Sequence, residues 1–218
     1  MLAFIAVWGW LAVALAAAVA VGSAYTIWRQ TALRNWRRLA AQLSGECKPR
    51  DAFSPALIAG TLNGRPYILE TAVSHEDDAP YFHTRGALPL RNRAAFILGL
   101  RRKSLLEEAQ TRRETITHEV SDPDFSRKFM LSCNNSAHLL TVLGVNACKT
   151  LQKYHDVEVY VRLQEIEWRR SGQIGSLKVI NELNEVISQL ADKIDALPPS
   201  TLTLSEKLSD EAVIEKGV

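Results

Sequence analysis

The chain has 218 residues, of which 23% are charged and 47% are hydrophobic, and its formal net charge at pH 7 is +2. This length suits one domain of ~150 residues with an attached segment, and it argues against two soluble domains. The small net charge argues against nucleic acid as a partner, so any electrostatic function must come from local clusters of charge.

The N-terminal segment, residues 1–28, contains no charged side chain. About 20 apolar residues in a helix cross the ~30 Å hydrocarbon core of a membrane. Trp8 and Trp10 near one end, with Tyr25 and Trp28 near the other, suit the aromatic belts at the two membrane interfaces. We therefore expect a transmembrane helix over residues 1–28.

A cleaved signal peptide is the competing interpretation of this segment. Small residues from Ala16 to Ala20 resemble a cleavage site, but a signal peptide normally begins with basic residues and has a shorter apolar core of roughly 7 to 15 residues. No Lys or Arg precedes Arg29. The pattern favours an uncleaved signal anchor, and cleavage stays open as the alternative.

Basic residues follow the apolar segment, and no acidic residue occurs before Glu46. An excess of Lys and Arg beside a membrane span marks its cytoplasmic side. We therefore expect a single-pass protein of the cell (inner) membrane, with the N-terminus outside, the C-terminal domain in the cytoplasm and the lipid bilayer as a partner. The basic residues are Arg29, Arg34, Arg37 and Arg38.

The three cysteines, Cys47, Cys133 and Cys148, agree with a cytoplasmic domain. Their number is odd and no two have the Cys-x-x-Cys spacing, so the sequence indicates neither a disulfide framework nor a zinc site. Reduced thiols are what the cytoplasm maintains.

Helical spacing continues beyond the apolar segment, because apolar residues recur at intervals of three and four from Leu33 to Leu43. We expect a basic helical stalk over residues 29–45 that ends at Ser44-Gly45. The soluble domain is expected over residues 46–198.

The domain begins with a predicted β-hairpin. Two β-type runs, Leu57–Leu62 and Pro66–Val73, flank Asn63-Gly64. Asn-Gly is typical of a type I′ hairpin turn, because both residues tolerate positive φ.

Several shorter elements follow in the central part of the chain. Ser104 and Glu107 have the spacing of a helix capping box, and Asp122-Pro123-Asp124 is typical of a turn. The expected elements are an acidic loop at Ser74–Ala79, strands at Tyr81–Leu88, Ala94–Leu100, Thr115–Glu119 and Phe125–Cys133, and a short helix at Ser104–Gln110.

The last third of the domain has clearer periodicity. We expect a helix over Ser136–Lys153 broken at Gly144, then a β-hairpin from Val157 to Trp168, in which alternation with period two indicates one buried and one wet face. A final amphipathic helix carries an apolar stripe from Ile180 to Leu197 and ends at Pro198-Pro199. Residues 199–218 lack periodicity and predict a disordered acidic tail. The expected fold class is α+β: an N-terminal transmembrane helix and stalk, then one antiparallel-sheet domain with a long C-terminal helix.

The segment from Ser121 to Phe129 follows the pattern Gly-Asp-x-x-Phe-Asp-x-x-Phe. Asp122, Phe125 and Phe129 keep this pattern, while Ser121 replaces the Gly and Ser126 the second Asp. The segment resembles a diffuse group of uncharacterised bacterial single-pass membrane-anchored proteins. The likeness extends loosely to the anchor and to Gly60-x-x-x-Gly64-Arg65. It implies a strand, a helix, a hairpin and a final helix, and no activity.

Two sets of polar residues contain side chains that occur in metal or catalytic sites. His75, Asp77, Asp78 and His83 are metal-capable, but they lack the fixed spacing of a metal motif and suit a solvated acidic loop.

Asp122 and Asp124, with His118 nearby, form a conceivable carboxylate pair, yet Asp-Pro-Asp is ordinary turn chemistry. Phosphate loops, dinucleotide fingerprints and nucleophile elbows are absent from the sequence. No catalytic, cofactor or metal residues are therefore predicted, and no cofactor is expected.

A basic cluster stands out because no Asp or Glu occurs between Ala79 and Leu106. Beside an anionic membrane leaflet, each Lys or Arg contributes ~1 kcal/mol of attraction, so we predict contact with anionic lipid head groups. A solvated basic strand edge is the alternative. The predicted lipid-contact residues are Arg85, Arg91, Arg93, Arg101, Arg102 and Lys103.

These patterns favour a membrane-anchored, non-enzymatic interaction or scaffold protein with an unknown membrane protein partner. The alternative is an enzyme or small-ligand-binding domain that acts at the inner membrane surface. A pocket with convergent polar groups would favour the alternative, and a flat surface over a filled core would favour the scaffold.

Overall fold

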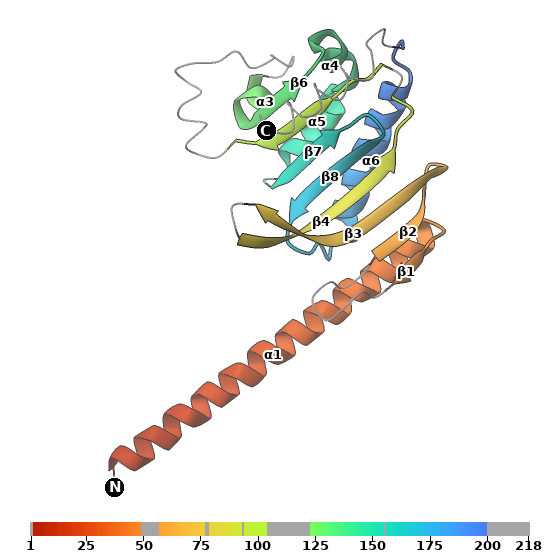
Figure 1. Ribbon diagram of the computed structural model, residues 1–218. Helices are drawn as coiled ribbons and strands as arrows, with labels where there is room; N and C mark the ends of the chain where they lie inside the picture. Colours follow the sequence, from red (N-terminus) through yellow and green to blue (C-terminus); the bar gives the residue numbers. More distant parts are fainter. Residues whose placement is uncertain are drawn as a thin grey trace.

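The chain folds into an α+β domain at the end of a long helix (Figure 1). The computed structural model describes residues 2–48, 57–76, 79–92, 94–103, 123–154 and 156–199. Within them, eight strands form one antiparallel sheet in the order β1-β2-β3-β4-β8-β7-β5-β6. The predicted class, an antiparallel α+β domain with a C-terminal helix, is confirmed.

The first helix, α1 (Leu2–Gln42), continues through the predicted segment and the predicted stalk without interruption. In the part of the chain that the structure describes, no helix combines the length and the apolarity that a membrane crossing requires. The structure therefore gives no support to the predicted transmembrane helix over residues 1–28.

The last turns of α1, which lie within the expected stalk of residues 29–45, pack into the domain core. Trp36 and Leu39 are 0% and 1% exposed, and Leu43 is also buried. The glycine at position 60 on β2 allows this close approach, because a Cβ there would lie 2.7 Å from the carbonyl oxygen of Leu43. The apolar spacing of residues 33–43 thus marks a face that packs on the sheet.

The predicted first hairpin is confirmed. Strands β2 (Leu57–Leu62) and β3 (Arg65–Glu76) are antiparallel neighbours, and Asn63 and Gly64 have φ values of 51° and 77°. Strand β1 (Glu46–Lys48) pairs with the outer edge of β2.

The predicted third strand is also present, as β4 (Ala79–Pro89). Strand β3 extends to Glu76 and pairs with Ala79 of β4, so the expected loop at Ser74–Ala79 is largely strand. Asp77 and Asp78 lie outside the described residues.

Two predictions in the middle of the chain are wrong. Strand β5 spans Leu98–Arg102 rather than Ala94–Leu100, and the segment predicted as one strand from Phe125 consists of helix α3 (Pro123–Lys128) and strand β6 (Phe129–Cys133).

Side-chain hydrogen bonds and helix-end chemistry account for both differences. The Asn92 amide donates to the carbonyl oxygen of Phe96 at 2.8 Å and accepts from its N–H at 2.9 Å, which closes a loop where a strand was expected. Pro123 begins α3, a position that needs no N–H donor, and Asp124 lies in its first turn.

The expected elements of the last third are confirmed. The Asn135 side chain accepts from two backbone N–H groups at the start of α4, and Gly144 separates this helix from α5. The elements are α4 (Ser136–Val142), α5 (Val145–Gln152), β7 (Val157–Val161), β8 (Glu165–Ser171) and α6 (Leu177–Asp195).

Helix α6 covers one face of the sheet (Figure 1). Its stripe of Leu183, Ile187 and Leu190 is at most 1% exposed. Beneath it, Tyr67 and Trp168 both donate hydrogen bonds to the side-chain oxygen of Asn184, at 2.5 and 3.1 Å. These bonds fix the helix on β3 and β8.

Three expectations fall on segments that the structure does not describe. They are the helix at Ser104–Gln110, the strand at Thr115–Glu119 and, apart from Pro199, the tail over residues 199–218. Ser121 and Asp122 of the resemblance motif also lie outside the described residues. Phe125 and Phe129 are buried, and their stacked rings have centroids 4.5 Å apart.

Candidate functional site

The sheet face opposite α6 carries a cluster of charged side chains, which we call the ion-pair network. Strands alternate their side chains between faces, so Trp168 packs under α6 while Glu167 and Arg169 point to the other face. The register places Arg85 of β4 opposite Arg169 of β8. Members of the network are Glu70, Arg85, Arg162, Glu165, Glu167 and Arg169.

Glu167 lies at the centre of this network. Its side chain is 0% exposed and contacts three guanidinium groups. Arg162 and Arg169 each approach Oε1 at 2.7 Å, and the Nε–H of Arg85 donates to Oε2. Arg85 also contacts Glu165 at 2.9 Å and Glu70 at 3.2 Å. Each buried charge therefore has an opposite charge beside it.

This environment determines the protonation state of Glu167. Burial by itself opposes ionisation, but the positive charges of Arg169, Arg85 and Arg162 outweigh burial and hold the Glu167 pKa below its usual range. A carboxylate that stays ionised at neutral pH is a poor proton donor. The network is therefore suited to positioning and recognition rather than to acid–base catalysis.

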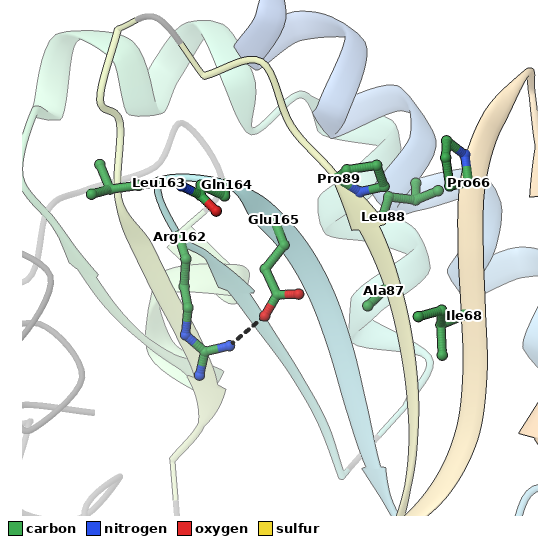
Figure 2. Close-up of a pocket in the computed structure, with 9 residues that line it drawn as sticks. All are labelled: Pro66, Ile68, Ala87, Leu88, Pro89, Arg162, Leu163, Gln164 and Glu165. Carbon is green, nitrogen blue, oxygen red and sulfur yellow. Dashed lines mark hydrogen bonds and ion pairs between the residues drawn. The ribbon is translucent and has the colours of Figure 1, made fainter.

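An apolar groove of about 530 Å³ borders the network at the turn between β7 and β8. Figure 2 shows two walls: apolar side chains from β3 and β4 on one side, and the β7–β8 turn on the other, where Arg162 pairs with Glu165 at 3.2 Å. Ile68 in the groove is 44% exposed. The lining residues are Pro66, Ile68, Ala87, Leu88, Pro89, Arg162, Leu163, Gln164 and Glu165.

The polar side chains of the groove lie at its rim. They belong to Arg162, Gln164 and Glu165, and none of the described lining residues is a Ser, Cys, His or Lys. The apolar wall suits an apolar or amphipathic segment, while Gln164 and the Arg162–Glu165 pair offer polar contacts at the rim.

The residues of the predicted basic cluster lie on separate strands of the sheet in the structure. Strands β8 and β7 lie between β4, which carries Arg85, and β5, which carries Arg101 and Arg102. Arg85 is bound to three carboxylates of the ion-pair network, and Arg93 lies outside the described residues.

Lys103 and Arg91 also occupy different environments. Lys103 is 3% exposed, and its ammonium group donates to the carbonyl oxygen of Ser126 at 3.2 Å. Arg91 is exposed in the loop after β4, beside Asp195. Lys103 is thus buried and Arg85 is occupied by ion pairs, while lipid contact by the predicted residues stays a prediction. The five members of the cluster that the structure describes lie in different environments.

The other polar sets do not assemble into a site within the described residues. No group of three His, Cys, Asp or Glu there is placed to hold a metal ion. His83 is buried on β4, and Asp124 is exposed and pairs with Arg127 at 3.1 Å. His118 lies outside the described residues.

Sequence reasoning missed Glu167 as the centre of the network. A signal was present, because Glu165, Glu167 and Arg169 occupy alternate positions of a strand. The alternation of apolar and polar residues predicted a solvent-facing side of the strand. It did not show that Arg85 and Arg162 would converge on one of these carboxylates.

Comparison with known proteins yields a likeness of fold. No family model and no curated protein matches the sequence. Among solved structures, the fold is similar to that in the crystal structure of the mycobacterial trehalose monomycolate transport factor A, TtfA. The TM-score is 0.51 and the sequence identity 11%, over 78% of this chain and 98% of that chain. The two chains therefore share an architecture.

Proposed function

We propose that this chain is a membrane-attached, non-enzymatic adaptor that presents the open face of its sheet to a membrane protein. One observation carries the proposal: the domain is built around the end of a helix whose other part is apolar and exposed. Along α1, Trp10, Val21 and Ile27 are 75%, 70% and 66% exposed.

Apolar side chains exposed to this extent are more favourable in an apolar environment than in water. Burial of apolar area yields roughly 25 cal/mol per Å², so covering the helical arm, residues 10–27, with lipid is strongly favourable. Arg29, Arg34, Arg37 and Arg38 follow the arm directly. These arginines support the finer proposal of a single pass, with the N-terminus outside and the domain in the cytoplasm.

The open face supports the adaptor role. Its apolar groove bordered by ion pairs has the composition of a protein interface, in which an apolar centre is surrounded by a polar rim. The structural neighbour is a mycobacterial transport factor. We therefore propose an accessory role in a membrane assembly, with transport as the first class to test.

Site-specific photo-crosslinking in intact cells tests this role. A crosslinker at Ile68 in the groove should capture a membrane protein, whereas one at Asn181, exposed on α6, should not. Removal of residues 2–28 should release the chain into the soluble fraction and abolish the Ile68 product. Equal capture at both positions, or membrane retention without residues 2–28, would contradict the proposal.

The groove itself favours a second candidate, a small-ligand-binding domain. A volume of about 530 Å³ lies within the range of small-molecule sites, ~300 to ~1,000 Å³. Native mass spectrometry of the detergent-purified protein should then show a bound amphiphile that Ala87→Trp displaces. An empty groove together with an Ile68 crosslink favours the adaptor.

A further inference from the structure

Helix α6 ends beside the apolar groove. The Asp195 carboxylate accepts hydrogen bonds from the guanidinium group of Arg65 at 2.6 Å and from the backbone N–H of Arg91 at 2.8 Å. Arg65 directly precedes Pro66 in the chain. Arg91 comes two residues after Pro89. Both prolines line the groove (Figure 2). The chain therefore leaves α6 at the same end of the sheet at which the groove lies.

The chain that follows α6 is long enough to reach the groove. Residues 200–218, which we call the tail, lie outside the described residues. An extended chain spans ~3.3 Å per residue, so Leu208, nine residues after Pro199, can lie as far as ~30 Å from it. The wall of the groove begins one residue from Arg65, whose guanidinium group binds the last turn of α6. The groove is therefore within reach of the tail.

The tail begins with an alternation of polar and apolar residues. In an extended chain, alternate side chains point to the same side, so Leu202 and Leu204 share one side, opposite the flanking threonines. The groove has a matching division, because an apolar wall from β3 and β4 faces the polar side chains of the β7–β8 turn. Leu208 supplies a third large apolar side chain.

Exposure and charge beside the groove favour this occupant. Ile68 is 44% exposed, and covering apolar surface yields roughly 25 cal/mol per Å². Arg91, which is exposed next to Asp195, has a charge opposite to that of the tail. Acidic side chains outnumber lysines there: Glu206, Asp210, Glu211 and Glu215 against Lys207 and Lys216. Attraction at an exposed site is modest, but it favours the tail over a basic segment.

We propose that the tail occupies the apolar groove of its own molecule, with Leu202, Leu204 and Leu208 against the wall formed by β3 and β4. Attachment to α6 gives the tail an effective concentration in the millimolar range at the groove. A contact with a dissociation constant of ~1 mM is therefore sufficient to keep much of the groove occupied.

The tail is then a competitor for the membrane protein that the groove is proposed to bind. A partner must displace the tail, so its apparent affinity falls in proportion to the fraction of molecules whose groove is free. This competition rests on the proposed adaptor function, whereas occupation of the groove by the tail does not.

Photo-crosslinking of the purified full-length protein in nonionic detergent tests the occupation. A crosslinking amino acid at Ile68 should join the groove to the tail within one molecule, and peptide mass spectrometry should locate the product in residues 200–218. Val73 is the matched position, because it is 40% exposed on the same strand but projects from the opposite face. Its tail product should be weaker by about fivefold or more.

Two sets of substitutions test the side chains of the tail. The leucine variant carries Leu202→Asp, Leu204→Asp and Leu208→Asp. It should reduce the Ile68 product about fivefold or more, because a charged side chain opposes burial against an apolar wall. The control adds the same charge at polar positions and should stay within about twofold of the unmodified yield. It carries Thr201→Asp, Thr203→Asp and Ser209→Asp.

Four results would overturn the occupation. They are the absence of a tail product from Ile68, equal tail products from Ile68 and Val73, equal losses in the leucine variant and its control, and a covalent dimer in place of the intramolecular product. The last result would mean that the groove takes the tail of a second copy.

Competition needs a second arm in intact cells. Deletion of residues 200–218 should raise the capture of a membrane protein by the Ile68 crosslinker about threefold, and the leucine variant should act in the same direction. Unchanged capture without the tail would contradict the competition. A tail product from the purified protein with no captured protein in cells would contradict the adaptor function and leave the occupation intact.

Discussion

The indole N–H of Trp36 donates to the carbonyl oxygen of Ile174 across 2.8 Å, which joins the N-terminal helix to the segment between β8 and α6. Trp36 is 0% exposed, so this contact lies inside the core. The apolar arm therefore leaves the domain in a direction set by packing rather than through a linker.

The first prediction concerns where the folding unit begins. A fragment that starts at Cys47 lacks Trp36, Leu39 and Leu43, and it should show no cooperative thermal transition by circular dichroism. A fragment that starts at Arg29 should melt cooperatively. In the full chain, Trp36→Ala should cost ~3 to 5 kcal/mol, and Arg38→Ala, an exposed neighbour, should be nearly neutral. Cooperative melting of the shorter fragment would show that the helix is dispensable.

A second prediction tests the docking of α6. Ile187 is 0% exposed in the stripe against the sheet, so Ile187→Ala should lower the free energy of unfolding by ~2 to 5 kcal/mol. The volume-conserving Ile187→Leu should cost less than ~1.5 kcal/mol. Denaturant titration measures both, with Asn181→Ala, exposed on the same helix, as the control. An unchanged midpoint for Ile187→Ala would be incompatible with the packing.

A third prediction follows from the lowered pKa of Glu167. Because its folded-state pKa lies below the usual value, the ionised group stabilises the fold at neutral pH, and this contribution disappears as the pH falls below about 4.5. Glu167→Gln should cost ~3 to 5 kcal/mol at pH 7, because it leaves three arginines without their shared carboxylate.

Stability curves from pH 7 to pH 3 are the measurement for this prediction. The acid limb of Glu167→Gln should be flatter than that of the unmodified protein. Glu185→Gln, exposed on α6, should follow the unmodified curve. Parallel acid limbs for all three proteins would mean that Glu167 is not the carboxylate that responds.

A fourth prediction concerns orientation. A C-terminal reporter enzyme that is active only outside the cytoplasm should stay silent, because four arginines follow the apolar segment and none precedes it. Replacing Arg29, Arg34, Arg37 and Arg38 with Gln weakens this bias and should raise the signal. A strong signal from the unmodified protein would reverse the orientation and revive a cleaved signal peptide.

Local sequence patterns determined most of the elements. Asn63-Gly64 specifies its turn because both residues tolerate positive φ, and the stripe of α6 follows directly from helical periodicity. Gly144 ended a helix where the sequence indicated. In each case the deciding interactions join residues close in sequence, so the pattern carries the information.

Tertiary structure decided what depends on distant residues. The helical spacing of residues 33–43 predicted a helix but not that Trp36 would reach Ile174. Lys103 belonged to a basic run, yet packing buries it against Ser126.

The order β4-β8-β7 brings Arg85, Arg162 and Arg169 together on Glu167. Strand order arises from pairings between segments far apart in the chain, which no local period encodes. Charge content was therefore readable from the sequence, whereas the convergence of particular charges required the folded sheet.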